Sequence, residues 1–257
     1  MDKSLLVRMI GFPATLIHGD PLVLDRWLWL KERLPETNNM EKLLDVGCGS
    51  GAFSIGAARR GYQATGLSWS ERRQNVAGER ATICGVQARF EVLDIRQLST
   101  RNDLVGQFDV AICLEVAELV LDDRKLIKDI AACLKPGGRL LLTAPYSLSR
   151  HIWKGDAGPF SLVEDGGHVR RGYTPAMLQE LCSEAGLISE HISFCSGCLS
   201  QELSLVLQKL SRIHFLLGWA ATLPLRVFPP LLDTLIHKLT GWPYFSICLE
   251  AYKPRFH

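Results

Sequence analysis

The sequence has little excess charge and no long uninterrupted apolar run. Its 257 residues carry 29 lysines and arginines against 27 acidic residues, a formal net charge of +2. This balance gives no broad basic field for nucleic acid, so we expect no nucleic-acid partner. The apolar stretches end before the ~20 residues that a membrane-spanning helix needs. The first residues also lack a signal-peptide pattern, and we expect a cytoplasmic protein.

Metal-ligand spacing is missing as well. Eight cysteines are scattered along the chain, several of them inside apolar runs, and the one close pair is Cys195 and Cys198 in "CSGC". A structural zinc site normally needs four ligands, and no second CxxC or histidine pair lies near this one. Thiols in apolar runs pack as small hydrophobic side chains in a reducing compartment. We therefore expect no metal site and interpret the pair as packed thiols near a strand end.

The chain also lacks internal repeats and low-complexity linkers. It shows instead an alternation of strands and helices along about 150 residues, with short runs of Val, Ile and Leu as the strands. Such continuous apolar runs suit strands that are covered on both faces. The pattern predicts an α/β fold, a doubly wound Rossmann-like sheet that binds ligands at the carboxyl ends of its strands. We expect one domain over residues 1–257.

Three segments stand outside this alternation. Residues 1–40 predict an N-terminal helical segment, in which Asp20 caps a helix and Pro21 opens it. Residues 146–173 and 199–243 interrupt the later part of the chain, and insertions of this kind commonly carry the specific function. We interpret 146–173 as a substrate loop and 199–243 as an apolar helical lid.

The stretch "LLDVGCGSGAF" runs from a predicted strand through three glycines into a predicted helix. Gly47, Gly49 and Gly51 allow a tight turn and a close approach of backbone to a ligand. The stretch also satisfies the dinucleotide pattern G-x-G-x-x-G/A, so taken alone it allows a nicotinamide dinucleotide or S-adenosylmethionine (SAM). Asp45 favours SAM, because a carboxylate at the strand end can receive the ammonium group of an amino-acid ligand.

Three further motifs follow in order: "EVLDI", "FDVAICLEVAEL" and "LKPGGRLLLTAP". With the glycine stretch they resemble the successive motifs of class I SAM-dependent methyltransferases, over roughly residues 40–145. The segment "HVRRGYTPAMLQELCSEAGL" is similar to the small-molecule branch of that family. The resemblance implies SAM as the cofactor and a seven-stranded, mostly parallel sheet whose last strand, "YFSICLEAYKP", is antiparallel.

The same resemblance implies a cofactor site. It places the glycine loop beside the amino-acid and ribose portions of SAM, Asp94 at the adenine, and Leu114 and Glu115 at the methionine part. The residues expected to bind SAM are Asp45, Gly47, Cys48, Gly49, Gly51, Ser68, Trp69, Asp94, Ile95, Leu114 and Glu115.

The sequence departs from the family at the end of the second predicted strand. Ser68 stands where the family usually has a carboxylate for the ribose hydroxyls, and a neutral hydrogen bond there costs ~1 kcal/mol, which binding survives. "SWSE" also reads as a capping box, so we expect Ser68 and Glu71 to cap the next helix. Trp69 either lies against the adenine or packs in the core, and both interpretations stay open.

A second departure is Leu119, which stands where many relatives have a histidine near the acceptor. His168, in "GGHVRRGY", is the leading substitute as catalytic base. The alternative is that His168 and Arg170 hold their loop to the domain by hydrogen bonds. Methyl transfer can also proceed by proximity and alignment alone, since the sulfonium is already activated. The residues expected at the acceptor are His151, Trp153, Arg170, Tyr173, Phe215 and Trp219.

The segment 213–232 is apolar but interrupted by prolines and by Arg226. It is either a buried helical cover or a lipophilic lid that encloses a greasy acceptor or touches a membrane, and the modest basic excess of 199–243 is compatible with peripheral membrane contact. We predict a SAM-dependent methyltransferase acting on a small lipid, isoprenoid or polyketide-like acceptor, with O-methylation favoured over C-methylation. The alternative is a SAM-binding protein that does not methylate, either a cofactor-assisted cyclase or a partner subunit.

Overall fold

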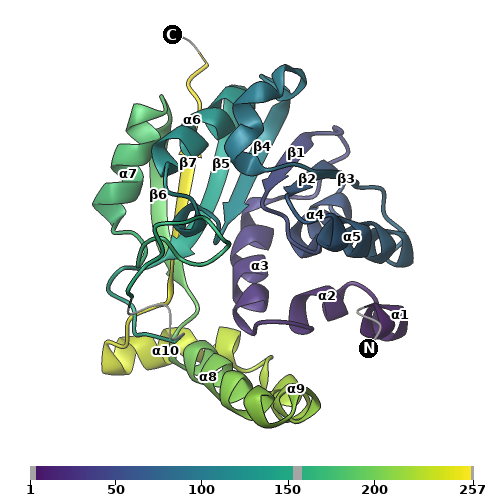
Figure 1. Cartoon of the computed structure of the whole chain (residues 1–257), viewed down its shortest axis with the longest axis vertical. Coiled ribbons are helices and arrows are strands. Elements are labelled where there is room, and N and C mark those ends of the chain that lie inside the picture. Colours follow the sequence, from purple (N-terminus) through teal and green to yellow (C-terminus); the bar gives the residue numbers. More distant parts are fainter. Residues whose placement is uncertain (1–3, 153–157, 256–257) are drawn as a thin grey trace.

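The computed structural model describes residues 4–152 and 158–255, without the side chains of 215–217. One seven-stranded sheet organises the described chain, in the order β3-β2-β1-β4-β5-β7-β6 (Figure 1). Strands β1 to β5 pair in parallel, and β7 is antiparallel to both of its neighbours. The predicted sheet, with its antiparallel last strand, is confirmed.

The elements have the following bounds. The strands are β1 (Lys42–Val46), β2 (Gln63–Ser68), β3 (Arg89–Val92), β4 (Phe108–Leu114), β5 (Leu134–Pro145), β6 (Ile188–Cys195) and β7 (Ser246–Tyr252). The α-helices are α1 (Leu5–Ile10), α2 (Pro13–Ile17), α3 (Leu22–Arg33), α4 (Ala52–Ala58), α5 (Glu71–Ile83), α6 (Asp123–Cys133), α7 (Pro175–Glu184), α8 (Cys198–Ile213), α9 (Phe215–Thr222) and α10 (Pro229–Thr240). Short 3₁₀ helices are η1 (Ile95–Thr100), η2 (Asn102–Leu104), η3 (Ala117–Leu119) and η5 (Leu223–Leu225).

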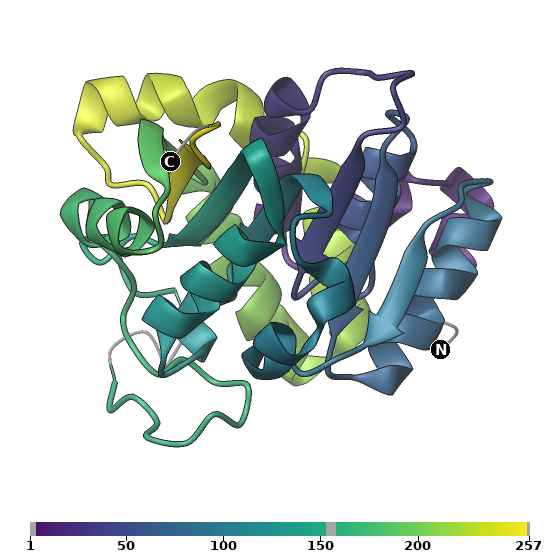
Figure 2. The ribbon, with the colours of Figure 1, turned by 90° about the horizontal axis from the view of Figure 1, so that it is seen from above.

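Helices lie on both faces of the sheet (Figure 2), and buried apolar side chains fill the space between the helices and the strands. On one face, Ile130 of α6 and Leu178 of α7 belong to the same buried cluster as Leu140 of β5. On the other face, Leu30 of α3 packs with Leu43 of β1 in a second cluster. Burial on both faces explains why the strands read as continuous apolar runs.

Side-chain caps begin several helices. The Thr174 hydroxyl caps α7 by accepting the Met177 N–H at 3.3 Å, and the Asp122 carboxylate caps α6 by accepting the Lys125 N–H at 2.9 Å. At α3 the capping residue is Pro21 and not the predicted Asp20, whose carboxylate accepts the Leu22 N–H at 3.0 Å from one position earlier.

The predicted Ser68–Glu71 capping box is wrong. Helix α5 begins at Glu71, so Ser70 is the capping residue. Ser68 is the last residue of β2, and its buried hydroxyl accepts the Ser70 N–H at 3.4 Å.

The "KPGG" segment also differs from the prediction, which placed a break before the fifth strand. Strand β5 already begins at Leu134 and continues through the segment. The pairing with β4 shifts register between Phe108 and Val110, and Gly137 has a φ of 81°. A local irregularity therefore absorbs the glycines without ending the strand.

Both insertions lie at one side of the sheet. The segment 146–173 follows the carboxyl end of β5, and helices α8, α9 and α10 connect β6 to β7 beneath the same side (Figure 1). Within the described residues, no helix combines the length and the apolar character that crossing a membrane requires. The insertions thus stand beside the edge where parallel strands present their carboxyl ends.

Candidate active site

The glycine loop between β1 and α4 separates two cavities. One measures about 380 Å³ and the other about 620 Å³, and Gly47 and Gly49 line both. The three loop glycines, at positions 47, 49 and 51, have φ values of 84°, 55° and 81°. These are left-handed conformations that residues with a Cβ rarely adopt.

The three glycines serve different purposes. A Cβ at Gly47 would lie 2.5 Å from Val116 Cγ2, and one at Gly51 would lie 2.8 Å from the Ala77 Cβ. A Cβ at Gly49 would meet no atom within 4 Å. Gly47 and Gly51 are therefore required by packing of the protein itself, whereas Gly49 leaves open space beside bare backbone, which fits a loop that cradles a ligand.

The smaller cavity gathers the ends of three strands. Ser68 ends β2, Asp94 and Ile95 follow β3, and Glu115 follows β4. Trp69 also lines this cavity, and its side chain is 67% exposed. The interpretation of Trp69 as a core residue is wrong, because a packed core residue would be buried.

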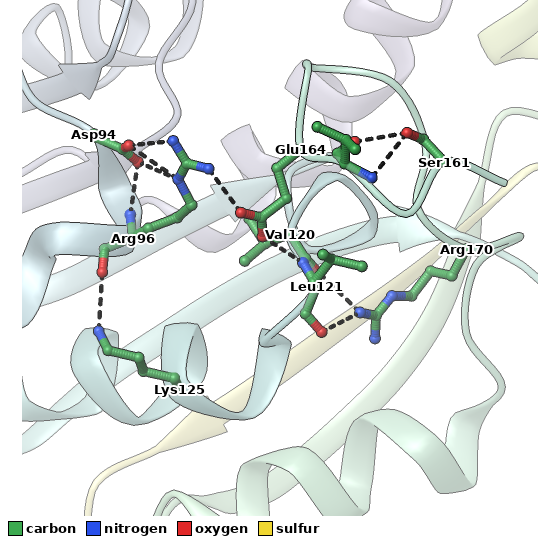
Figure 3. Close-up of polar contacts among 9 residues, drawn as sticks. Asp94, Arg96, Val120, Leu121, Lys125, Ser161, Glu164 and Arg170 are labelled. Atoms are coloured by element: carbon green, nitrogen blue, oxygen red, sulfur yellow. Dashed lines mark hydrogen bonds and ion pairs between the residues drawn. The ribbon is translucent and has the colours of Figure 1, made fainter.

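Asp94 belongs to a charged network at the rim of this cavity (Figure 3). Arg96 Nε donates to both Asp94 oxygens at 2.9 Å, and Arg96 Nη1 donates to Glu164 Oε2 at 2.7 Å. Glu164 in turn accepts the Leu121 N–H at 2.6 Å. Hydrogen bonding to Arg96 lowers the pKa of the Asp94 carboxyl, which stays ionised. The contact between Asp94 and the adenine remains a prediction. In the structure Arg96 already binds the Asp94 carboxylate and would compete with the adenine amino group for it.

Asp45, Cys48 and Leu114 line the larger cavity, on the other side of the loop. The Asp45 carboxylate is buried and accepts a hydrogen bond from the Ser54 hydroxyl at 2.6 Å. Burial raises the pKa of Asp45 to about 7. A cation bound there would stabilise the ionised carboxylate, so this donor set fits the ammonium group of an amino-acid ligand.

Sequence reasoning missed the group that holds Glu115. Arg26 of α3 lies 3.3 Å from Glu115 Oε2, and the Ser246 hydroxyl donates to Oε1 at 2.9 Å. These contacts hold Glu115 in a backbone conformation with a φ of 54°. Near them, burial and the charge of Glu115 raise the pKa of the fully buried Glu118. The available signal was the charged pair Asp25-Arg26 inside the apolar run "LVLDRWLWL".

The substrate loop is tied to the domain by Arg170. Its guanidinium donates to the Asp123 carboxylate and to the carbonyls of Val120 and Leu121, the last two at 2.7 and 2.8 Å. The role of Arg170 at the acceptor stays a prediction, although its guanidinium already donates to these three groups. Tyr173 donates to Asp123 at 2.8 Å and is fully buried. The acceptor contact of Tyr173 stays a prediction, although its ring lies in the core.

The remaining acceptor residues are not brought together in the described part of the chain. The His168 carbonyl accepts the Ser161 N–H at 3.3 Å, but His168 is not among the described residues that line either cavity. His151 is exposed after β5, and Trp219 is half-buried in α9. Trp153 and the side chain of Phe215 lie outside the described residues. The roles of these residues stay predictions.

No group of three or more His, Cys, Asp or Glu side chains able to hold a metal occurs within residues 4–152 and 158–255. Cys195 and Cys198 are free thiols at the end of β6 and the start of α8.

Comparison with known proteins decides the family. A family model described as a methyltransferase domain matches residues 24–191, well over half of the chain. The chain belongs to this methyltransferase family. Its cofactor is SAM, which agrees with the open backbone at Gly49 and the buried acid at Asp45.

Curated relatives are also methyltransferases, and solved structures share the fold. The ubiquinone biosynthesis O-methyltransferase of Marinobacter nauticus is 37% identical over 103 residues, which are 40% of this chain and 43% of that protein. The first curated relatives are thus matched over less than half of their own length. A putative sarcosine dimethylglycine methyltransferase from Galdieria sulphuraria superimposes with a TM-score of 0.63, at 16% identity, over 91% of this chain and 87% of that one. The [4+2]-cyclase SpnF superimposes with a TM-score of 0.61, at 21% identity, over 90% of this chain and 81% of that one.

Proposed function

We propose that this methyltransferase transfers the methyl group of SAM to a hydroxyl oxygen of a small lipophilic acceptor of the isoprenoid type. The relatives named as ubiquinone biosynthesis O-methyltransferases support an oxygen acceptor, although their match covers only part of their length. The fold is compatible with many methyl acceptors. The substrate class is therefore inferred from the side chains that line the cavity.

The observation that carries the proposal is the apolar wall of the smaller cavity. Its members are Ile95, Val116, Leu119 and Val120, which line the cavity together with polar groups at the ends of β2 and β3. A lipophilic acceptor gains about 25 cal/mol for each Å² of apolar surface that it buries there. Leu119 contributes to this wall at the position where many relatives have a histidine.

The residues of the chain divide the work of the reaction. SAM supplies an activated methyl group when it is bound. Asp45 and the bare backbone at Gly49 hold its charged end, Ser68 offers a hydroxyl to the ribose, and the apolar wall orients the acceptor and excludes water. His168 is the proposed base that removes the proton of the acceptor hydroxyl. It belongs to the substrate loop, which Arg170 holds to the domain by hydrogen bonds.

A peripheral membrane contact is the second part of the proposal. Along α10, Phe228, Leu231, Leu235 and Leu239 are spaced by three and four residues, and their exposed fractions are 50%, 74%, 54% and 75%. This spacing puts them on one face of the helix. Burying each such side chain contributes ~2 kcal/mol, so the α10 face can hold the protein loosely at a lipid surface that contains its acceptor.

An assay of both products tests the reaction. The enzyme is incubated with SAM and a short-chain prenylated phenol, and S-adenosylhomocysteine and the methyl ether are measured together. We expect the two in equal amounts. Conversion of the acceptor without S-adenosylhomocysteine would instead favour the non-methylating alternative, for which the cyclase likeness shows the fold alone.

A further inference from the structure

A third cavity lies apart from the glycine loop. It measures about 540 Å³ and is formed by α3, the end of β6 and α10, and it shares no lining residue with the two cavities of the active site. Figure 2 shows α10 running along the side of the sheet near α3. The proposed methyl transfer makes no use of this cavity.

Aromatic and apolar side chains form its walls. The rings of Phe194 and Tyr244 are stacked within 17° of parallel, with their centroids 6.3 Å apart. Trp29 lies beside them, with its indole N–H donating to the Ser193 hydroxyl at 3.0 Å. Leu231, the most exposed apolar lining residue, connects the cavity to the α10 face.

Two carboxyl groups lie among these apolar walls. Asp233 is satisfied, since it accepts the Leu199 N–H at 2.6 Å and the Ser200 hydroxyl at 2.8 Å. Asp25 is only 7% exposed, and its Oδ2 has no hydrogen-bond partner among the described residues. With the exposed Glu32, the lining has three acidic residues and a single basic one, Lys31.

We propose that this cavity binds the ammonium group of an amphiphile, with Asp25 as the counter-ion and the apolar chain lying along the α10 face. A cation satisfies the unpartnered oxygen and is attracted to the aromatic faces. An anion would meet two buried carboxyl groups, and a neutral apolar ligand would leave the Asp25 oxygen without a partner.

The ionisation of Asp25 is compatible with this role. Burial raises its pKa to about 7; the nearby hydroxyls of Ser200 and Ser196 offset part of this shift, Asp233 adds to it and Arg26 reduces it. The carboxylate form therefore predominates at pH 8, and an ammonium group beside it stabilises that form further. Binding is best measured at that pH.

Calorimetry with three ligands of equal chain length tests the proposal. Octylammonium, octanol and octyl sulfate are titrated into the protein at pH 8, below their aggregation concentrations. We expect octylammonium to bind about tenfold tighter than octanol, or about 1.4 kcal/mol, and octyl sulfate to bind more weakly than both. Asp25→Asn should abolish the preference, whereas Glu190→Gln, which removes an exposed carboxylate outside the cavity, should keep it. Equal affinities in the parent, or a preference that survives Asp25→Asn, would overturn the proposal.

A variant at the surface keeps the proposal testable if the buried Asp25→Asn variant does not fold. Leu231→Arg puts a cation at the exposed mouth of the cavity and should weaken octylammonium binding at least about tenfold. Met9→Arg makes a comparable change at an exposed apolar residue of α1, outside both the cavity lining and the α10 face, and should have little effect. Equal effects of the two variants would also overturn the proposal.

A competition experiment distinguishes two sources of the ammonium group, a membrane headgroup and a soluble alkylamine. If vesicles containing phosphatidylethanolamine displace octylammonium and vesicles of phosphatidylglycerol do not, the ammonium site takes a membrane headgroup. If neither displaces it, the site takes a soluble alkylamine. Displacement by phosphatidylglycerol vesicles to the same extent would contradict recognition of the ammonium group.

Discussion

At the scale of single residues, the acid at the end of β1 combines a cost to the fold with a use in binding. Asp45 is buried beside Ser54, and its pKa is raised to about 7 from an ordinary value of 3.8. A raised carboxyl pKa means that the folded state prefers the protonated form. Stability therefore falls as pH rises from about 4 to about 7, and the full cost remains above that range.

The first prediction concerns Asp45→Asn, which keeps the shape of the side chain but carries no charge. The variant should gain stability relative to the parent as pH rises, by up to roughly 4 kcal/mol above pH 7. It should also lose most SAM affinity. Denaturant unfolding at pH 5 and pH 8, with calorimetry of SAM, measures both effects. A stability difference that is the same at the two pH values would show that Asp45 does not titrate in this way.

The second prediction separates backbone strain from ligand contact. Gly49→Ala and Gly85→Ala both place a Cβ at a positive φ, 55° and 66°, where no atom lies within 4 Å. Each should cost roughly 1 to 2 kcal/mol of stability. Only Gly49→Ala should weaken SAM binding, because only that Cβ enters the space beside the loop. Thermal melting and calorimetry of the two variants make the comparison, and parallel losses of SAM affinity would refute the assignment of the loop.

The third prediction tests the base on the substrate loop. His168→Ala should lower turnover roughly a hundredfold or more while SAM affinity stays the same. His191→Ala, an exposed histidine on β6, serves as the control. Turnover and SAM affinity are measured for both variants. Equal losses of melting temperature and activity in His168→Ala would identify a structural tie instead of a base.

Much of the cofactor site could be predicted because its residues follow strands directly. Asp45, Ser68, Asp94 and Glu115 each sit at or just beyond a strand end, and parallel strands bring those ends to one edge. Arg26 could not be found in this way. Its partner Glu115 is far away in sequence, and only the packing of α3 against the sheet brings the two together.

At the scale of elements, the type of each main helix and strand followed from its periodicity and its flanking residues. Two wrong predictions, the capping residue of α5 and the start of β5, concern places where the local sequence allows two structures equally well. Two serines in "SWSE" could cap α5, and the one next to the helix does so. The glycines of "KPGG" are compatible with a break or with an irregular strand, and pairing with β4 and β7 decides for the strand. Strands β4 and β7 are distant in sequence from this segment, so a short stretch of sequence does not reveal the pairing.

The fourth prediction concerns the exposed face of α10. Changing Leu235 and Leu239 to Ser should reduce co-sedimentation with anionic liposomes by at least about tenfold, since each lost apolar contact is worth ~2 kcal/mol. The fold and SAM binding should be unaffected, because these side chains are 54% and 75% exposed. Exchanging the exposed Leu162 and Val163 of the substrate loop for Ser is the matched control. Unchanged sedimentation of the α10 variant would remove the membrane contact from the proposal.

At the scale of the whole molecule, we propose separate tasks for the sheet and its two insertions. The sheet provides the glycine loop and the polar strand ends that suit SAM, and the insertions add the substrate loop and the α8–α10 cover at the same side. The sequence predicted this division because the insertions break the alternation. The sequence did not predict that Leu231, Leu235 and Leu239 are exposed, because their exposure depends on how α10 packs against α8.

The most direct measurement uses SAM with a deuterated methyl group. The enzyme is supplied with labelled SAM and a prenylated phenol, and the product is analysed by mass spectrometry and fragmentation. We expect one trideuteromethyl group on the phenolic oxygen, in an amount equal to the S-adenosylhomocysteine formed. Label on a ring carbon would contradict O-methylation, and turnover of the acceptor with no label incorporated would contradict methyl transfer itself.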